Sequence, residues 1–154
     1  MAGAMRPPQN RGVVMGQGGM VASAHPLVTA GGLQVLREGG NAADAAVAMA
    51  ALNGVCLPST NGIGGDMFCL YFDATSQTLT GFNGNGAAGA GAHVAELQRR
   101  GHRQMPARGP LTVTVPGAVD GFCSVRDTFG TMPLTRLFAD AIRYAEEGLS
   151  LIHI

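Results

Sequence analysis

The sequence predicts a mixed α+β fold, in which helices pack beside a short antiparallel sheet. Two observations carry this prediction. First, an apolar strand segment, 67–72, and a second strand segment, 78–82, flank the turn 73–77, which is the pattern of a β-hairpin. Second, segments with apolar residues at helical spacing lie on both sides of this hairpin along the chain. The expected order is helix, helix, hairpin, helix, strand, helix, helix, with no internal repeat.

The first part of the chain predicts one short strand and two helices. Residues 19–24 are the strand candidate. Pro26 suits the first turn of a helix that Gly39 and Gly40 end, and its expected apolar stripe is Leu27, Ala30, Leu33 and Leu36.

The second helix is expected to be buried on several sides. Asn41 is its predicted N-cap, with Asp44 at the capping-box position. Residues 42–52 are apolar nearly all round the helix, which is typical of a helix with neighbours on several faces.

The rest of the chain predicts two glycine-rich loops and further helices. The continuous apolar run 67–72 favours a central strand. The remaining expectations are loops at 57–66 and 83–91, helices at 92–100, 118–129 and 131–147, and a strand at 111–115. The last helix should carry the ion pairs Arg136–Asp140 and Arg143–Glu147 on its polar side.

Composition excludes several classes of protein. Positive and negative side chains balance, 46% of residues are hydrophobic and 13% are charged. The chain is therefore too apolar for a disordered segment, and it lacks the basic excess of a protein that binds nucleic acid or an anionic membrane. No apolar run reaches the ~18 residues of a membrane span. The low charge suggests surfaces that a larger protein covers.

The cysteines, the histidines and the N-terminus give no indication of a disulfide, a metal site or a signal peptide. Cys56, Cys69 and Cys123 are predicted to be buried free thiols. The histidines have no metal-ligand spacing, so no metal site is expected. The first twenty residues lack the apolar core of a signal peptide. A cytoplasmic location is expected, with the periplasm or secretion left open if the N-terminus is incomplete.

Two glycine-rich motifs are candidates for chemistry. Gly84-x-Gly86-x-x-Gly89 has the form of a dinucleotide-binding turn, but a chain with 24 glycines matches it easily by chance. Its strand is hairpin-paired and no acidic residue follows at the usual distance, so a packed loop is the alternative. The second motif, with Gly62, Gly64, Gly65 and Asp66, is either a tight helix-to-strand connection or a loop that borders a pocket. No serine or threonine lies in a nucleophile motif.

Four stretches together resemble the gamma-glutamyltransferase (glutathione hydrolase) family. They are 19–55, 62–68, 114–122 and 129–148, and they follow the family's order and spacing. The blocks GGNAADAAVA and GIGGD are their most specific parts.

The resemblance implies the four-layer αββα fold of N-terminal-nucleophile hydrolases. In this family a zymogen cleaves itself into a large and a small subunit. A threonine at the start of the small subunit attacks the gamma-glutamyl amide, with its own α-amino group as base, and the acyl group passes to water or to an amino acid. The resemblance implies no metal or organic cofactor.

The chain resembles only the opening part of the large subunit. The T-T-H run that starts the family's small subunit is absent, so no catalytic residue is assigned in this chain, and the chain alone is expected to be inactive. The implied partners are a small acyl-amide substrate and the missing remainder of its own chain. A non-catalytic scaffold or binding module of the same fold is the alternative.

Asn83 departs from the family's pattern. The family's large subunit carries an arginine after the second strand of the hairpin, in a run such as D-F-R-E-T-A-P, and this arginine binds the substrate's α-carboxylate. In the matching run 81–87, Asn83 occupies that position. Asparagine hydrogen-bonds a carboxylate without supplying charge. Asn83 is therefore predicted to border an acyl pocket of the acylase-like branch, for a gamma-glutamyl or another acyl group.

Three segments are expected along the chain. Residues 1–18 are a loose leader, 19–148 are the incomplete N-terminal part of the large-subunit domain, and 149–154 are a non-native tail. The tail, LSLIHI, replaces the family's usual F-P-V-S continuation and is what a transposon end used in sequencing libraries would encode.

Overall fold

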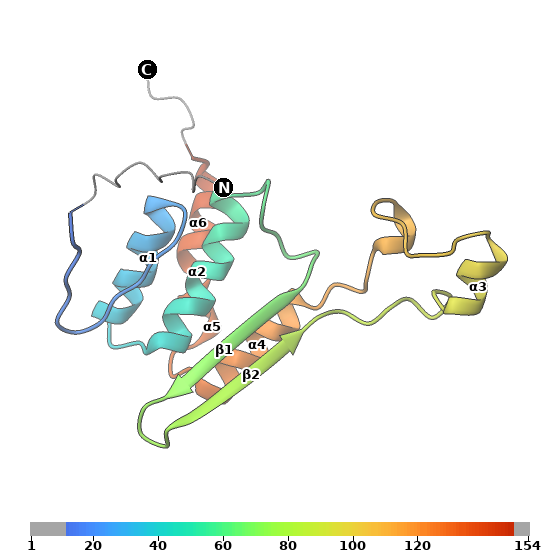
Figure 1. The fold of residues 1–154 in the computed structure, drawn as a ribbon. Helices are drawn as coiled ribbons and strands as arrows, with labels where there is room; N and C mark the ends of the chain where they lie inside the picture. Colours follow the sequence, from blue (N-terminus) through green and yellow to red (C-terminus); the bar gives the residue numbers. More distant parts are fainter. Residues whose placement is uncertain (1–11, 150–154) are drawn as a thin grey trace, which may run out of the picture.

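The computed structural model describes residues 12–149 and contains one two-stranded sheet with helices on one of its faces (Figure 1). The predicted α+β class is confirmed. The first eleven residues of the expected leader and residues 150–154 of the expected tail lie outside the described part. The elements are α1 (Pro26–Arg37), α2 (Ala42–Cys56), β1 (Met67–Asp73), β2 (Thr78–Gly84), α3 (Val94–Arg99), η1 (Pro110–Thr112), α4 (Ala118–Phe129), α5 (Leu134–Leu137) and α6 (Ala139–Glu147).

Helix α1 forms where predicted, but its buried face differs from the predicted stripe. The Nδ1 atom of His25 accepts a hydrogen bond from the Leu27 N–H, and Pro26 occupies the first turn. The fully buried residues are Val28, Gly32 and Val35. A side chain at Gly32 would overlap Met49 of α2, so this glycine lets the two helices approach closely.

Helix α2 is the centre of the described fold. It contacts α1, α4, α5 and α6 and so is buried on several sides, as predicted. It continues four residues beyond the predicted end, to Cys56. Leu52 lies between α1 and α6 in one apolar cluster, while Val47 and Ala48 belong to a second cluster with Phe122 and Leu137.

Asp44 is the one buried charged residue among the described residues, with no exposed surface. Its carboxylate completes the predicted capping box by accepting from the Asn41 N–H at 2.9 Å. It also accepts from the Thr131 N–H and hydroxyl, at 2.9 and 2.7 Å, and from the Met132 N–H at 3.1 Å. Burial acts to raise the pKa of Asp44, but these hydrogen bonds outweigh it and hold the pKa below the ordinary value.

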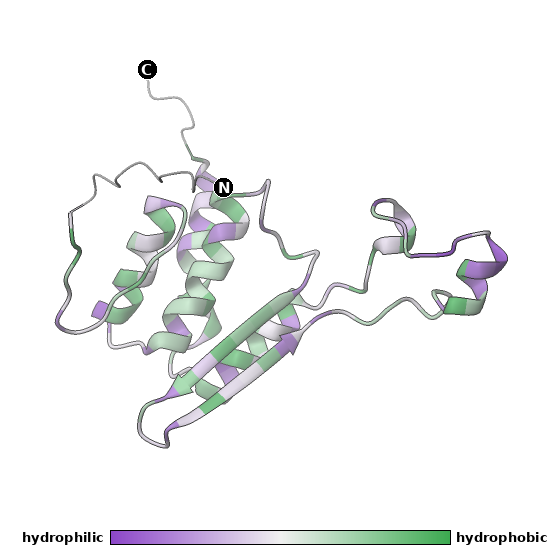
Figure 2. Ribbon diagram, in the orientation of Figure 1, coloured by the Kyte–Doolittle hydropathy of each residue, from purple (hydrophilic) through white to green (hydrophobic). Residues whose placement is uncertain are grey.

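The two strands form an antiparallel hairpin in which Phe68 pairs with Asn83 and Tyr71 with Thr80. One face packs on α4, where Tyr71 stacks on Phe129 with ring centroids 4.0 Å apart. The other face is apolar and uncovered by the described residues. Most of β1 has the hydrophobic colours of Figure 2. Phe68, Leu70 and Phe72 are 68%, 76% and 55% exposed. The continuous apolar run of β1 is thus half outward-facing, and β1 pairs with β2 alone in the described residues.

Three predicted elements are wrong or altered. Residues 19–24 form no strand. Residues 111–115 are not a strand, because Leu111 and Thr112 lie in η1 and Val115 makes a single backbone bond, to Ala87. The predicted helix 131–147 begins only at Leu134 and breaks at Phe138. Thr131 and Met132 lie before it as a segment whose N–H groups are bound to Asp44.

The hairpin and helices α3 and α4 form where predicted, with small shifts. Helix α4 has the predicted bounds, and α3 is shorter than predicted at both ends. Both predicted ion pairs are present, at 3.6 Å each. Arg136 additionally pairs with Glu38 at the end of α1, a contact that helical spacing could not reveal. None of the helices between residues 12 and 149 has the length and hydrophobicity of a membrane span.

Replacing Asp44 by Asn is expected to lower the free energy of unfolding by about 3 kcal/mol. An amide cannot accept from all the donors that face this carboxylate, so buried N–H groups lose their partners. Because folding lowers the pKa of Asp44, its stabilisation is present above the ordinary value of 3.8 and is lost as the pH falls through the folded value. Urea unfolding at pH 7 and pH 3 measures both effects.

The matched control is Asp120→Asn, an exposed carboxylate in the first turn of α4. It should change the unfolding free energy by less than about 1 kcal/mol. Equal urea midpoints for wild type and Asp44→Asn at pH 7 would show that the Asp44 network is not a main source of stability.

Candidate functional site

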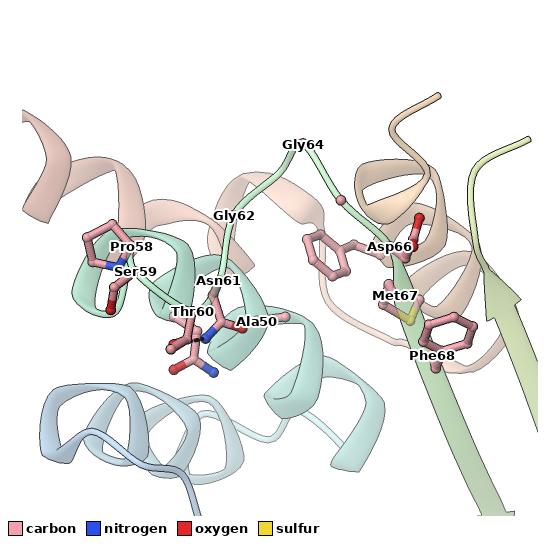
Figure 3. A pocket seen from close by; sticks show the side chains of 13 residues that line it. Ala50, Pro58, Ser59, Thr60, Asn61, Gly62, Gly64, Asp66, Met67 and Phe68 are labelled. Carbon is pink, nitrogen blue, oxygen red and sulfur yellow. Dashed lines mark hydrogen bonds between the residues drawn. The ribbon is translucent and has the colours of Figure 1, made fainter. Parts of the chain in front are cut away.

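The loop between α2 and β1 forms one wall of a surface cavity of about 590 Å³ (Figure 3). Helix α2 ends at Cys56, and the Leu57 carbonyl accepts from the Thr60 and Asn61 N–H groups, which turns the chain away from the helix. The loop then arches over to β1. The predicted pocket-bordering residues Gly62, Gly64, Gly65 and Asp66 all line this cavity, together with Ala50, Asn53, Pro58, Ser59, Thr60, Asn61, Met67, Phe68 and Phe122.

Asp66 connects this loop to two distant segments. Its Oδ1 atom accepts from the Gly86 N–H at 3.1 Å and from the Thr114 hydroxyl at 3.3 Å. One residue earlier, the Gly65 carbonyl accepts from the N–H groups of Gly117 and Ala118 at 3.1 and 2.9 Å. The loop is therefore fixed against the end of the hairpin and the start of α4.

The glycines of the Gly84-x-Gly86-x-x-Gly89 motif allow this convergence of chains. A side chain at Gly86 would overlap the Val115 carbonyl oxygen, and one at Gly84 would lie 2.9 Å from the Met67 carbonyl oxygen. Gly89, by contrast, has open space around it. The pattern Gly84-x-Gly86-x-x-Gly89 thus includes two positions where backbones meet, which supports a packed loop.

The described residues lack the parallel strand and directly following helix that a dinucleotide-binding turn requires. A dinucleotide-binding turn links a parallel strand to the helix that follows it directly. Here the preceding strand is antiparallel to β1, and the next helix starts only at Val94.

Asn83 lies on the exposed face of the hairpin, beside Phe68 in the pairing register. Its Oδ1 atom accepts from the Asn85 N–H at 3.0 Å, which fixes the side-chain orientation. Its Nδ2 group makes no hydrogen bond within residues 12–149, so it can donate to a ligand oxygen.

The structure brings the two sets of predicted site residues near each other without merging them. Asn83 does not line the cavity of Figure 3 but a neighbouring shallow hollow with Leu70 and Gly81. Phe68 lines both and so connects them. Phe68 was not singled out by sequence, because the alternation of inward and outward residues is hidden in a continuous apolar strand.

The described lining of these two hollows offers hydrogen bonds rather than positive charge. No arginine or histidine lines either one. The polar side chains there are asparagine amides, the hydroxyls of Ser59 and Thr60, and the Asp66 carboxylate. These groups suit a neutral amide or an acyl oxygen better than an isolated carboxylate.

Nucleophiles and metal ligands are not assembled in the described residues. Burial raises the pKa of the Cys56 and Cys69 thiols, which leaves them protonated and weakly reactive. All three cysteines are free. Residues 12–149 contain no group of three or more His, Cys, Asp or Glu side chains placed to hold a metal ion.

Comparison with known proteins gives a consistent set of relatives. The profile of the gamma-glutamyltranspeptidase family matches residues 29–153. The oxamate amidohydrolase proenzyme of Klebsiella pneumoniae is 41% identical over 138 residues, which covers 85% of this chain and 25% of that protein. The chain spans about a quarter of the length of the curated relatives it matches.

Two solved structures resemble the fold closely. A cephalosporin acylase from Bacillus halodurans has a TM-score of 0.83 and 39% identity, covering 97% of this chain and 28% of that one. The gamma-glutamyltranspeptidase of Helicobacter pylori has a TM-score of 0.81 and 31% identity, covering 91% of this chain and 41% of that one.

Replacing Gly86 by Ala should destabilise the contact between residues 84–87 and 113–117 by about 1–3 kcal/mol, because the added methyl overlaps the Val115 carbonyl. Hydrogen exchange of the Val115 amide, which is bonded to the Ala87 carbonyl, reports this contact directly. Exchange should be faster in the variant.

Gly89→Ala is the control from the same motif, since nothing lies near a side chain there. It should leave the Val115 exchange rate unchanged. If both substitutions accelerate exchange equally, close packing against Val115 does not explain why position 86 requires a glycine.

Proposed function

The chain belongs to the gamma-glutamyltranspeptidase family, and from that premise we propose that it supplies the N-terminal part of the large subunit of a self-cleaving amide hydrolase or acyltransferase. The nucleophile is a threonine outside this chain, at the start of the small subunit. The family match over residues 29–153 carries the proposal. Relatives named as proenzymes support the self-cleavage.

The exposed face of the hairpin supports a role inside a larger protein. Phe68, Leu70 and Phe72 place a row of large apolar side chains in solvent, beside Leu79 of β2. Monomeric proteins rarely leave such a contiguous apolar surface open. In the proposed enzyme a second sheet covers this face, which gives the two central layers of the αββα arrangement that the family resemblance implies.

We propose that the substrate is an amide whose acyl group differs from gamma-glutamyl. The position of the family's carboxylate-binding arginine is Asn83, whose free Nδ2 donor suits an acyl oxygen but supplies no charge. The similar oxamate amidohydrolase and cephalosporin acylase are named for other amide substrates.

We expect the full-length protein to cleave itself. Denaturing electrophoresis of the purified product should show two fragments, and mass spectrometry should find threonine at the new N-terminus. Replacing that threonine by alanine should leave one intact chain, because the nucleophile is then missing. An intact wild-type chain would instead support the non-catalytic scaffold.

The substitution Asn83→Arg in the full-length protein tests the position of Asn83 at the acyl pocket. A guanidinium there can pair bidentately with an α-carboxylate, so KM for a gamma-glutamyl anilide should fall by about tenfold, which corresponds to one charge-assisted contact of about 1.4 kcal/mol. Initial rates over a range of anilide concentrations measure this.

Asn85→Arg is the matched control, since Asn85 is an exposed asparagine two residues away in the same turn. It adds the same charge without occupying the proposed position, and its KM should stay within about twofold of wild type. Equal KM values for Asn83→Arg and wild type would show that Asn83 does not border the acyl pocket.

A further inference from the structure

A basic arm, residues 85–117, extends away from the body of the fold and carries α3 (Figure 1). Hydrogen bonds between the arm and the rest of the described chain all lie at its base. The Asp66 carboxylate accepts from the Gly86 N–H and the Thr114 hydroxyl, and the Gly65 carbonyl accepts from the Gly117 N–H. The Asn83 side chain accepts from the Asn85 N–H. The tip of the arm makes no hydrogen bond to the body among residues 12–149.

Charge is distributed unevenly between the arm and the body. The arm contains four of the ten arginines but one acidic residue, Glu96. Nine of the ten acidic residues therefore lie outside it. A chain with no net charge thus has a positive extension on a negative body.

Glu96 neutralises only part of the arm. It pairs with both Arg99 and Arg100, each at 2.7 Å, and these partners lower its pKa to about 2. Arg103 and Arg108 are exposed and take part in no ion pair within the described residues. In the body, three of the four described arginines, Arg126, Arg136 and Arg143, are paired with carboxylates.

Exposed apolar residues lie among these arginines. Val94, Met105 and Val113 are each more than half exposed on the arm, and both hydrophilic and hydrophobic colours occur at α3 in Figure 2. Arginine and methionine with apolar neighbours are typical of protein–protein contact surfaces. Guanidinium groups also suit interface pairing with carboxylates. The combination favours a protein surface over a small anion as the occupant.

We propose that the basic arm docks on an acidic surface of the same full-length protein, in the part that lies outside this chain. This rests on the proposed function, in which the chain is one portion of a larger enzyme. The chain spans about a quarter of the length of its curated relatives, so most of a protein of that length is available as the partner. The arm then joins the portion described here to the remainder through ion pairs made by Arg103 and Arg108.

Hydrogen–deuterium exchange on the full-length protein tests the docking. Peptides from residues 93–108 should exchange slowly at 50 mM salt and several-fold faster at 500 mM salt, because salt screens exposed ion pairs. Arg103→Glu and Arg108→Glu should each accelerate exchange about three- to fivefold at low salt.

Arg37→Glu is the matched control, since Arg37 is exposed in α1 and takes part in no ion pair within residues 12–149. It should leave exchange of the arm unchanged. Rapid exchange in the wild type at low salt, or equal effects of all three substitutions, would overturn the proposal. Exchange that slows with increasing protein concentration would identify a second copy as the occupant and also overturn it.

These outcomes are separable from failure of the proposed function. Self-cleavage is read from the fragments on a denaturing gel, whereas docking is read from amide exchange in the arm. A protein that cleaves itself but leaves the arm unprotected contradicts only the docking.

Discussion

The buried carboxylate of Asp44 is the interaction on which the arrangement of the described helices depends. It sits at the start of α2 and binds backbone groups of the segment that enters α5, so residues 87 positions apart in the chain are held together. Gly130 makes this approach possible, because a side chain there would meet the Asp44 carboxylate at 2.7 Å. A charge without solvent is tolerated only with its hydrogen bonds complete. The network therefore fixes α2, the end of α4 and the start of α5 relative to one another.

That fixed helical layer determines how the hairpin is presented. Phe129, at the end of α4, packs against Tyr71 and Phe82 of the two strands, so the inward face of the hairpin follows from the position of α4. The outward face then carries Phe68 and Asn83 at one end, next to the loop of the cavity. Asp66 and the glycines around it hold that end in place. The site is thus a consequence of packing on the opposite face of the sheet.

Sequence patterns predicted local structure well and long-range contacts poorly. The capping box of Asn41 and Asp44 and the ion pairs Arg136–Asp140 and Arg143–Glu147 depend on neighbours three or four residues apart, and these were found. The second function of Asp44, as a partner of Thr131 and Met132, depends on the tertiary fold and has no sequence period. For the same reason the predicted helix 131–147 began too early.

The candidate site divides in the same way. The glycine loop was recognised from its glycine-rich sequence and Asn83 from the family resemblance. Their separation into a cavity and a shallow hollow joined by Phe68 required the register of the hairpin. We propose that this register presents Asn83 to the acyl group of a substrate. A crystal structure of the full-length protein with a trapped acyl-enzyme would show this contact. We expect the Asn83 amide within about 3 Å of an acyl oxygen, with Phe68 beside it. An acyl group bound elsewhere, with Asn83 facing solvent, would contradict it.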